Sequence, residues 1–358
     1  MAHKPHKPIS LKELSATLGL SQSTVSRIVN GEADRFRIAR DTQKRVLHAA
    51  GLYGYTANSV ARSLRQKRTY TIGVIVPEIS EGYSTAVLGG IEDELLKEGF
   101  FYFVVSHRHR DDLLSAYPRM MLARSVEGII AVDTNIEEDL PLPVVAVSGH
   151  IERDGVVNIQ LDHNKAAELA LTHLKSLGHE HIAFIKGQAL SSDTSLRWQA
   201  INETARALAI PINPDLVVQL QSLEPGPGPG LEVTRQLLQT GKRFTAIFAF
   251  NDVTAMGAIQ ALREASLRIP KDVSVVGFDD ILAAATNNPP LTTVHQPLRS
   301  MGQEAARTLL GLVRDKDFRP HSSVVTVHPK FVVRRSTAHV ITHPPLAVES
   351  QATDTATH

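Results

Sequence analysis

Residues 10–30 read SLKELSATLGLSQSTVSRIVN, a pattern that predicts two short helices joined by a turn. In the first helix, Leu11, Leu14 and Leu18 recur at the spacing of one helix face. Ser10 precedes them and is a suitable N-cap residue. We therefore expect a helical hairpin that buries its leucine side.

The second helix follows a turn at Gly19 and begins after Ser21, which is another suitable cap. Val25, Ile28 and Val29 would face inward. The outward face would consist of Gln22, Ser23, Thr24, Ser26 and Arg27. Such side chains suit base edges and phosphates, so the segment predicts a DNA-reading helix-turn-helix. A plain helical hairpin with a solvated polar face is the alternative.

Charge is distributed unevenly along a chain whose formal net charge is +1. Residues 1–69 carry 13 Lys and Arg against 4 Asp and Glu, and the rest of the chain carries 25 against 33. A basic N-terminal module on an acidic body is typical of a protein that contacts a polyanion through one part only. Double-stranded DNA is the partner that this asymmetry favours.

Length and composition restrict the protein class further. A chain of 358 residues predicts two or three domains. It contains no Cys, which excludes disulfides, thiolate metal sites and a cysteine nucleophile. No apolar run has the length of a signal peptide core or a membrane span, so we expect a cytoplasmic protein without membrane contact.

A third helix and a short hinge helix are predicted next. Residues 41–55, DTQKRVLHAAGLYGY, complete a three-helix head. Its buried side would consist of Val46, Leu47 and Ala50. Residues 56–68, TANSVARSLRQKR, predict a helix of about two turns capped by Asn58. A helix this short is marginal in water, so we expect it to be disordered until a partner holds it.

From Thr71 onward, apolar runs of strand length alternate with helical patterns, which predicts parallel sheets covered on both faces. Two such series of similar length predict two doubly wound subdomains with a ligand cleft between them. The low-complexity run PGPGPG at 225–230 is interpreted as a surface loop. The strands are TIGVIVP, FYFVVS, GIIAVD, VVAVSG, VVNIQLD, HIAFIKG, VVQL, AIFAF and VSVVGFD, and helices are expected at 90–98, 113–124, 164–177, 196–208, 231–240 and 254–265.

Over residues 9–335 the sequence resembles the lactose/galactose repressor (LacI/GalR) family of bacterial transcription regulators. The motifs that carry the resemblance are LGLSQSTVSRIVNG, ANSVARSLR, TIGVIVPEIS, VEGII, GHEHIAFIKG, AIFAFNDVTAMGAIQAL, IPKDVSVVGFDD and PPLTTVHQP, in the order of the family. The resemblance implies a homodimeric repressor that binds a pseudo-palindromic operator in double-stranded DNA. It also implies a small-molecule effector: a sugar, a sugar phosphate or a nucleobase-like compound.

The expected architecture is an all-α helix-turn-helix head with a hinge helix, followed by an α/β effector domain like a periplasmic binding protein. We expect the head at 1–56, hinge and linker at 57–69, the effector N-subdomain at 70–161 plus about 296–322, the C-subdomain at 162–295 plus about 323–337, and a disordered tail at 338–358.

The resemblance assigns DNA contacts residue by residue. Gln22 and Ser23 match variable base-reading positions, and Arg27 matches a base- or phosphate-facing position one turn later. Leu64 matches a hinge leucine that wedges into the minor groove, in keeping with how apolar side chains open that groove. The complete expected set is Ser10, Ser21, Gln22, Ser23, Thr24, Ser26, Arg27, Asn30, Asn58, Val60, Ala61 and Leu64.

For the effector, the resemblance places Tyr83, Arg197, Asn251 and Asp279 in the cleft. A guanidinium holds carboxylates, phosphates or paired hydroxyls, and Asp and Asn bond to polyols. Asp252 is interpreted instead as the N-cap of the next helix.

The chain also departs from the family. Ala39 stands where a Ser or Thr usually caps the third helix, and Ala57 replaces a proline before the hinge. The loop 32–38 is longer and more basic, so Arg35 and Arg37 are expected to add phosphate contacts. No aromatic residue lies near 223–224, which argues against a sugar stacked there.

Two other functions were compared with a regulator. A soluble sugar-binding protein without operator-specific DNA binding would leave the basic head unexplained. An enzyme would need a nucleophile motif, a phosphate loop or a metal-spaced cluster, and the pairs His107/His109 and His179/His181 lack supporting ligands. We expect a protein that is not an enzyme and that uses no cofactor or metal.

Overall fold

The computed structural model describes residues 9–55 and 68–341, except positions 81, 137, 151–152, 316, 319 and 321. The chain divides into two compact units, Met1–Thr69 and Tyr70–His358, which we call the head and the body. The expected hinge positions Asn58, Val60, Ala61 and Leu64 lie outside the described residues.

The head contains three helices, α1 (Leu11–Leu18), α2 (Gln22–Val29) and α3 (Arg40–Leu52). Ser10 Oγ accepts a hydrogen bond from the Glu13 amide at 3.2 Å, and the Glu13 carboxylate accepts one from the Ser10 amide at 2.8 Å. This reciprocal pair is a capping box, which satisfies donors that the first helical turn leaves free. Ala39 gives α3 no side-chain cap, as expected from the sequence.

Small and branched apolar side chains form the core of the head. Leu14 and Val25 are fully buried, and the inward positions predicted for α2 are confirmed for Val25 and Ile28. The prediction for Leu47 is wrong, because its side chain is 54% exposed. The buried face of α3 consists instead of Val46, Ala49 and Ala50, which share one side of a helix at spacings of three and four.

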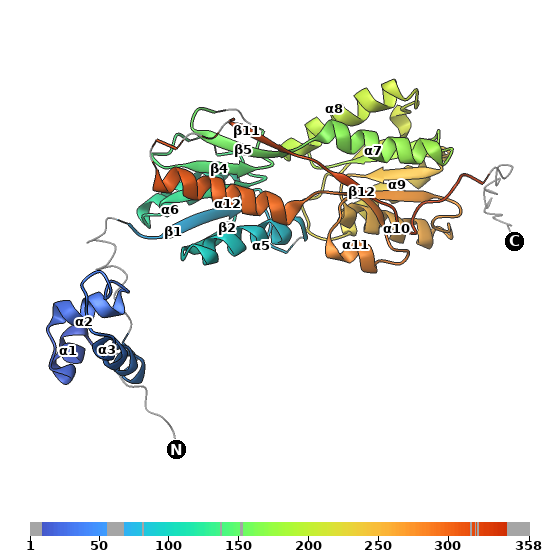
Figure 1. Ribbon diagram of the computed structural model, residues 1–358. Coiled ribbons are helices and arrows are strands. Elements are labelled where there is room, and N and C mark those ends of the chain that lie inside the picture. The colour runs from blue at the N-terminus through green and yellow to red at the C-terminus, as the bar shows by residue number, and fades with distance from the viewer. Residues whose placement is uncertain are drawn as a thin grey trace, which may run out of the picture. The chain divides into compact units, whose positions relative to one another are not determined.

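The body has two lobes, each built on a six-stranded sheet (Figure 1). The N-lobe sheet has the order β11-β5-β4-β3-β1-β2 and is parallel throughout. Its strands are β1 (Thr71–Val76), β2 (Phe101–Ser106), β3 (Gly128–Val132), β4 (Val144–Val147), β5 (Val156–Leu161) and β11 (Val324–Val327). Its helices are α5 (Gly82–Lys97), α6 (Asp111–Ala123) and α12 (Leu298–Arg314).

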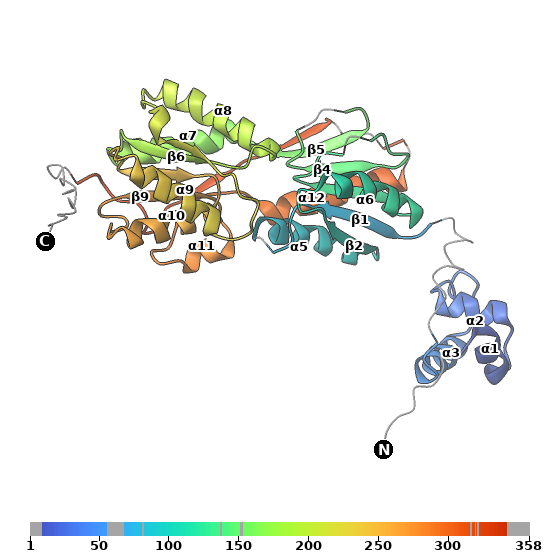
Figure 2. The same ribbon diagram turned by 180° about the vertical axis from the view of Figure 1, so that it is seen from behind.

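Helices α5 and α12 cover one face of the N-lobe sheet and α6 covers the other (Figures 1 and 2). The pair α5 and α12 is held at very close range by two glycines. A Cβ on Gly90 would lie 2.8 Å from the Arg299 carbonyl carbon, and a Cβ on Gly302 would lie 3.0 Å from the Ile91 nitrogen. The sequence placed the start of α5 at Gly90, eight residues later than the structure does.

The C-lobe sheet has the order β12-β10-β9-β8-β6-β7, and only the edge strand β12 runs antiparallel. Its strands are β6 (Ile182–Lys186), β7 (Val217–Gln219), β8 (Ala246–Ala249), β9 (Ser274–Asp279), β10 (Thr292–His295) and β12 (Lys330–Val332). Its helices are α7 (His163–Ser176), α8 (Ser192–Ala207), η1 (Pro214–Leu216), α9 (Gly228–Gln239), α10 (Asp252–Glu264) and α11 (Leu282–Thr286).

Helices α7 and α8 cover one face of the C-lobe sheet, and α9 and α10 cover the other. The interpretation of 225–230 as a surface loop is wrong for its second half. Residues 228–230 form the first turn of α9, and Gly230 is buried against the backbone of Thr254 in α10. The run therefore lets two helices approach closely.

The chain passes between the lobes three times, after β5, between β10 and α12, and between β11 and β12. The last passage lies at 328–329, later than the boundary expected after 322, because β11 pairs with β5 in the N-lobe. The expectation that the chain is disordered from residue 338 onward is wrong for residues 338–341. Ala338 donates a backbone hydrogen bond to Ser274 Oγ at 3.1 Å, and Val340 donates one to the Leu177 carbonyl at 3.0 Å.

Within the described residues, no helix combines the length and the apolar character that crossing a membrane requires.

Candidate functional site

A cleft of about 580 Å³ lies where strands of both lobes end. Pro77 and Glu78 follow β1, Asp133 follows β3, Phe250 follows β8, and Asp279 ends β9. Parallel sheets place ligands beyond the carboxyl ends of their strands, so this is the expected position for a binding site. All four residues that the sequence assigned to the effector line this cleft: Tyr83, Arg197, Asn251 and Asp279.

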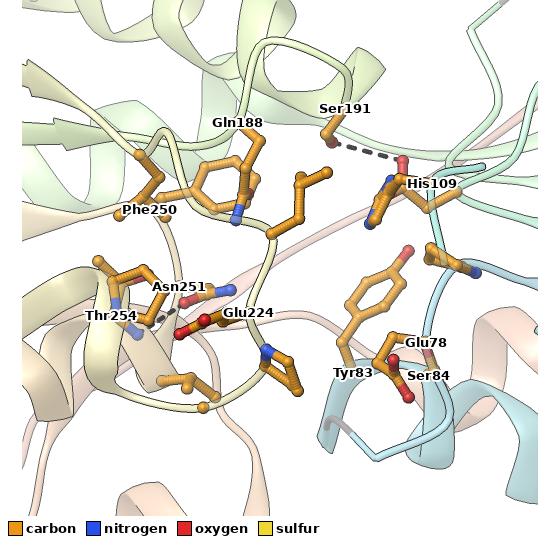
Figure 3. Close-up of a pocket in the computed structure, with 18 of the residues that line it drawn as sticks. Glu78, Tyr83, Ser84, His109, Gln188, Ser191, Glu224, Phe250, Asn251 and Thr254 are labelled. Atoms are coloured by element: carbon orange, nitrogen blue, oxygen red, sulfur yellow. Dashed lines mark hydrogen bonds between the residues drawn. The ribbon is translucent and has the colours of Figure 1, made fainter. Parts of the chain in front are cut away.

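Tyr83 reaches the cleft from the first turn of α5, facing Asn251 and Phe250 of the C-lobe (Figure 3). Its hydroxyl donates a hydrogen bond to Ser148 Oγ at 2.7 Å. Burial raises the pKa of Tyr83 well above its ordinary value, and the carboxylates of Asp193 and Asp133 raise it further. The hydroxyl therefore stays protonated and remains a donor.

Arg197 is 4% exposed and is held between two aromatic rings. Its guanidinium carbon lies 3.6 Å from the centroid of Phe278 and 4.5 Å from that of Phe250. Nη1 donates to the Phe250 carbonyl oxygen, and Nη2 donates to Asp193 Oδ2 at 3.2 Å. This geometry fixes the guanidinium, and Asp193 already offsets its charge.

Asp279 presents its carboxyl group at the end of β9 with a backbone φ of +108°. Gln296 donates a hydrogen bond to its Oδ1 at 2.6 Å. Burial raises the pKa of Asp279 well above its ordinary value, although Arg197 opposes this effect. This position lets the carboxyl group form hydrogen bonds with a ligand hydroxyl.

Left-handed backbone conformations recur at the strand ends around the cleft. Besides Asp279, non-glycine residues with positive φ follow β2 (His109), β3 (Asp133) and β4 (Ser148). Such conformations cost free energy and persist where the surrounding structure imposes them, commonly at binding sites. The rim of the cleft is thus held in a preset shape.

The N-cap of α10 is Asn251, not Asp252 as the sequence suggested. The Asn251 side chain caps α10 by accepting a hydrogen bond from the Thr254 amide at 2.8 Å. Asp252, interpreted as that cap, is fully buried and accepts hydrogen bonds from Thr293 Oγ1 at 2.5 Å and the Ile281 amide at 2.8 Å. Burial raises its pKa to about 7. It joins the loop after Asp279 to α10 and so supports the cleft indirectly.

The first turn of α8 joins the lobes, and sequence reasoning missed this contact. Asp193 lines the cleft and accepts a hydrogen bond from His150 Nε2 of the N-lobe at 2.6 Å. Beside it, Ser192 donates to the Ser148 carbonyl at 3.2 Å. Ser191 donates to Asp133 at 3.4 Å (Figure 3). The polar run SSD at 191–193 was the available signal, but its partners are more than 40 residues away.

One histidine of each pair that was considered for metal binding has structural partners. Thr134 Oγ1 lies 3.0 Å from His107 Nε2, and burial with nearby His109 lowers the pKa of His107 to about 4. His179 contacts Thr245 Oγ1 at 2.9 Å and the Ala338 carbonyl at 3.0 Å.

In the head, part of the face of α2 that was expected to read DNA is exposed. Gln22 and Ser23 are exposed, while Ser21 Oγ caps the helix through the Thr24 amide at 3.1 Å. Asn30 Nδ2 donates to the Ser26 carbonyl at 2.7 Å. Gln22 projects from the start of α2, while Ser23 Oγ lies within hydrogen-bond distance of Ser21 Oγ, at 2.9 Å.

Arg27 is supported by a residue that the sequence did not single out. Its guanidinium carbon lies 3.8 Å from the ring centroid of Phe36, in the longer loop that joins α2 to α3. The guanidinium carbon of Arg35 lies 5.8 Å from the same ring centroid. A stacked guanidinium loses less conformational freedom on binding than a free one.

Comparisons with known proteins agree with this geometry. A periplasmic binding protein-like domain model matches residues 171–337. The transcriptional repressor PurR of Pasteurella multocida is 30% identical over 336 residues, covering 91% of this chain and 98% of that protein. The lac repressor dimer bound to operator and an anti-inducer gives a TM-score of 0.80 at 25% identity, covering 93% of this chain and 100% of that chain. The chain belongs to the LacI/GalR family.

Another solved member of the LacI/GalR family, from Enterococcus faecium and with bound ribose, is 27% identical with a TM-score of 0.66. It covers 76% of this chain and is itself covered completely. As a LacI/GalR family member, the chain is a ligand-responsive, DNA-binding transcription regulator, and its relatives are repressors rather than enzymes. The fold class and family expected from the sequence are confirmed.

Proposed function

We propose that the protein is a repressor that binds a pseudo-palindromic operator as a homodimer and is controlled by a small, uncharged, hydroxyl- or amide-rich ligand in the cleft. The observation that carries this proposal is the coexistence in one chain of a basic helix-turn-helix head and a preset cleft between two lobes. The reading residues would be Gln22, Ser23 and Arg27.

The charge of the cleft supports an uncharged ligand. Its only strongly buried cation, among the described lining residues, is Arg197, and this side chain is already paired with Asp193. A phosphate or carboxylate would meet a surplus of acids, which costs free energy in a site partly removed from water. The acidic lining residues are Glu78, Asp133, Asp193, Glu224 and Asp279, against the guanidinium groups of Arg108 and Arg197.

Exposed apolar side chains on one side of the body support a dimer. Leu96 of α5 is 61% exposed, Phe101 of β2 is 67% exposed and Leu282 of α11 is 88% exposed. Both ribbon views place α5, β2 and α11 along the same edge of the body (Figures 1 and 2). A second copy with the same patch would cover these side chains in a two-fold interface.

Ligand control is tested by a thermal-shift screen with neutral sugars, nucleosides and nucleobases against matched sugar phosphates. We expect stabilisation by a neutral class, and loss of that stabilisation in Arg197→Lys, which cannot keep the planar stacking. Arg206→Lys is the matched control, because Arg206 lies on the same helix with an exposed side chain. Stabilisation by phosphorylated compounds alone would refute the uncharged-ligand proposal.

DNA reading is tested separately on operators obtained by selection from random duplexes. Affinity should fall steeply as salt rises, because phosphate contacts release counterions. Arg27→Ala should relax base preference, whereas Arg62→Ala should weaken binding to all sequences alike. Equal effects of both substitutions on every duplex would contradict the reading role of Arg27.

A further inference from the structure

Three metal-ligating side chains from three elements meet at the contact between the lobes. His150 follows β4 of the N-lobe, His163 is the first residue of α7, and Asp193 lies in the first turn of α8. Asp193 Oδ1 lies 2.6 Å from His150 Nε2 and 3.3 Å from His163 Nε2. One ligand atom from each residue lies within 4.8 Å of the other two.

The histidines of this cluster are buried and incompletely bonded. The side chains of His150, His163 and Asp193 are 9%, 8% and 6% exposed. Within the described residues, His163 Nδ1 and Nε2 and His150 Nδ1 have no hydrogen-bond partner. His163 Nε2 nevertheless points at the shared carboxylate. Leaving buried imidazole nitrogens unbonded costs free energy, and a bound cation would remove that cost for His163 Nε2.

Asp193 is prepared to act as an anionic ligand. Its Oδ1 lies 2.6 Å from His150 Nε2 and 3.3 Å from His163 Nε2, and its Oδ2 lies beside the guanidinium of Arg197. Arg197 Nη2 holds the second carboxylate oxygen at 3.2 Å, which leaves Oδ1 directed at the two imidazoles. Hydrogen bonds of this kind orient carboxylate ligands in metal sites.

We propose that His150, His163 and Asp193 bind one divalent transition-metal ion of the zinc class. Two imidazole nitrogens and one carboxylate oxygen form a ligand set that suits zinc and its neighbours, with metal–ligand distances of about 2.0–2.2 Å. Ligand atoms around a tetrahedral ion lie about 3.3 Å apart at those distances, so His150 and Asp193 would need to separate by less than about 1 Å. Asp193 lines the cleft, so the fourth position would be open to water or to a ligand hydroxyl.

A metal at this position would connect the lobes. Because His150 belongs to the N-lobe and the other two ligands belong to the C-lobe, the ion would favour the arrangement of lobes in which all three ligands meet. The alternative occupant of the cluster is a proton shared between imidazole and carboxylate, which would leave the site without metal affinity.

The test is titration of metal-free, full-length protein with Zn²⁺ by calorimetry, together with Co²⁺ absorption spectra. We expect one ion per chain, with affinity reduced at least about tenfold in His163→Gln and in Asp193→Asn. His181→Gln is the matched control, because His181 is exposed and outside the cluster, and it should bind as the unaltered chain does. Circular dichroism shows whether each variant is folded.

X-ray absorption of the zinc-loaded unaltered protein supplies a measurement that needs no variant. Scattering from two imidazoles and additional oxygen would support the site. Absence of stoichiometric zinc binding, undiminished affinity in both folded variants, or a spectrum without imidazole scattering would each overturn the proposal.

Discussion

Substituting Gly90 with alanine tests whether the glycine contacts hold α5 against α12. A Cβ at this position would lie 2.8 Å from the carbonyl carbon of Arg299, closer still to its oxygen, and 3.0 Å from the Gln303 nitrogen. These are backbone atoms of the facing helix and cannot rotate away. The helices would have to separate, which would strain the core of the N-lobe.

Two opposing effects determine how far Gly90→Ala changes the free energy of unfolding. Alanine in place of glycine inside a helix contributes about 1 kcal/mol in favour of folding. Overpacking against fixed backbone costs up to about 3 kcal/mol. Gly90→Ala should therefore lower the free energy of unfolding by about 2 kcal/mol, which corresponds to about 3 °C in the melting temperature of a body this size.

Gly89→Ala is the matched control on the same helix. Its Cβ would meet only the end of the Arg299 side chain, at 2.9 Å from Nη1, and that side chain is exposed and flexible. This variant should gain the higher helix propensity of alanine without a clash, so it should melt at or above the temperature of the unaltered protein. Differential scanning calorimetry of both variants measures the comparison. Equal melting temperatures for the two variants would refute the close-contact argument.

Two further outcomes follow from buried and stacked side chains. Because the folded-state pKa of Asp252 is about 7 against an ordinary 3.8, its contribution to stability is complete below pH of about 4 and is lost as pH rises through 7. Relative to Asp252→Asn, the unaltered protein should lose up to about 4 kcal/mol of unfolding free energy between pH of about 4 and pH of about 7. Urea unfolding of both proteins at several pH values measures this difference. A difference that does not change with pH would contradict the expectation. In the head, Phe36→Ala should weaken operator binding about two- to fivefold, because it removes the ring on which Arg27 stacks. Phe36→Leu should have the same effect, since leucine also lacks the ring face. Fluorescence anisotropy measures both variants, and unchanged operator affinity in both would exclude the stacking role.

Local patterns in the sequence were sufficient for the head and for most of the body. Cap residues and apolar spacing identify α1 and α2, because both signals act within a few residues of each other. Near-continuous apolar runs identify the buried parallel strands. The rule that ligands bind beyond the strand ends predicts the cleft, and the family resemblance places Tyr83, Arg197 and Asp279 in it, where the structure also has them.

Errors arose where two adjacent positions compete for one role. Asn251 and Asp252 are equally suitable helix caps by residue type, and only the packing of Asp252 against Thr293 decides which residue caps α10. Likewise, Leu47 has the apolar character of a core residue, but the buried side of α3 carries Ala49 and Ala50 and leaves Leu47 exposed. Residues 225–230 look like a loop because nothing nearby in the sequence reveals that α10 lies against Gly230.

The sequence by itself determined the helix-turn-helix, the two doubly wound lobes, the family and the main residues of the cleft, because hydrophobic periodicity, capping and ordered motifs are local properties of the chain. Only the tertiary structure decided the late third passage between the lobes, the stacking of Arg27 on Phe36, and the meeting of His150 with His163 and Asp193. These contacts depend on how separate elements approach one another in space. The spacing of apolar residues in the sequence does not predict how these elements approach, because the approach results from the packing of whole elements around shared cores.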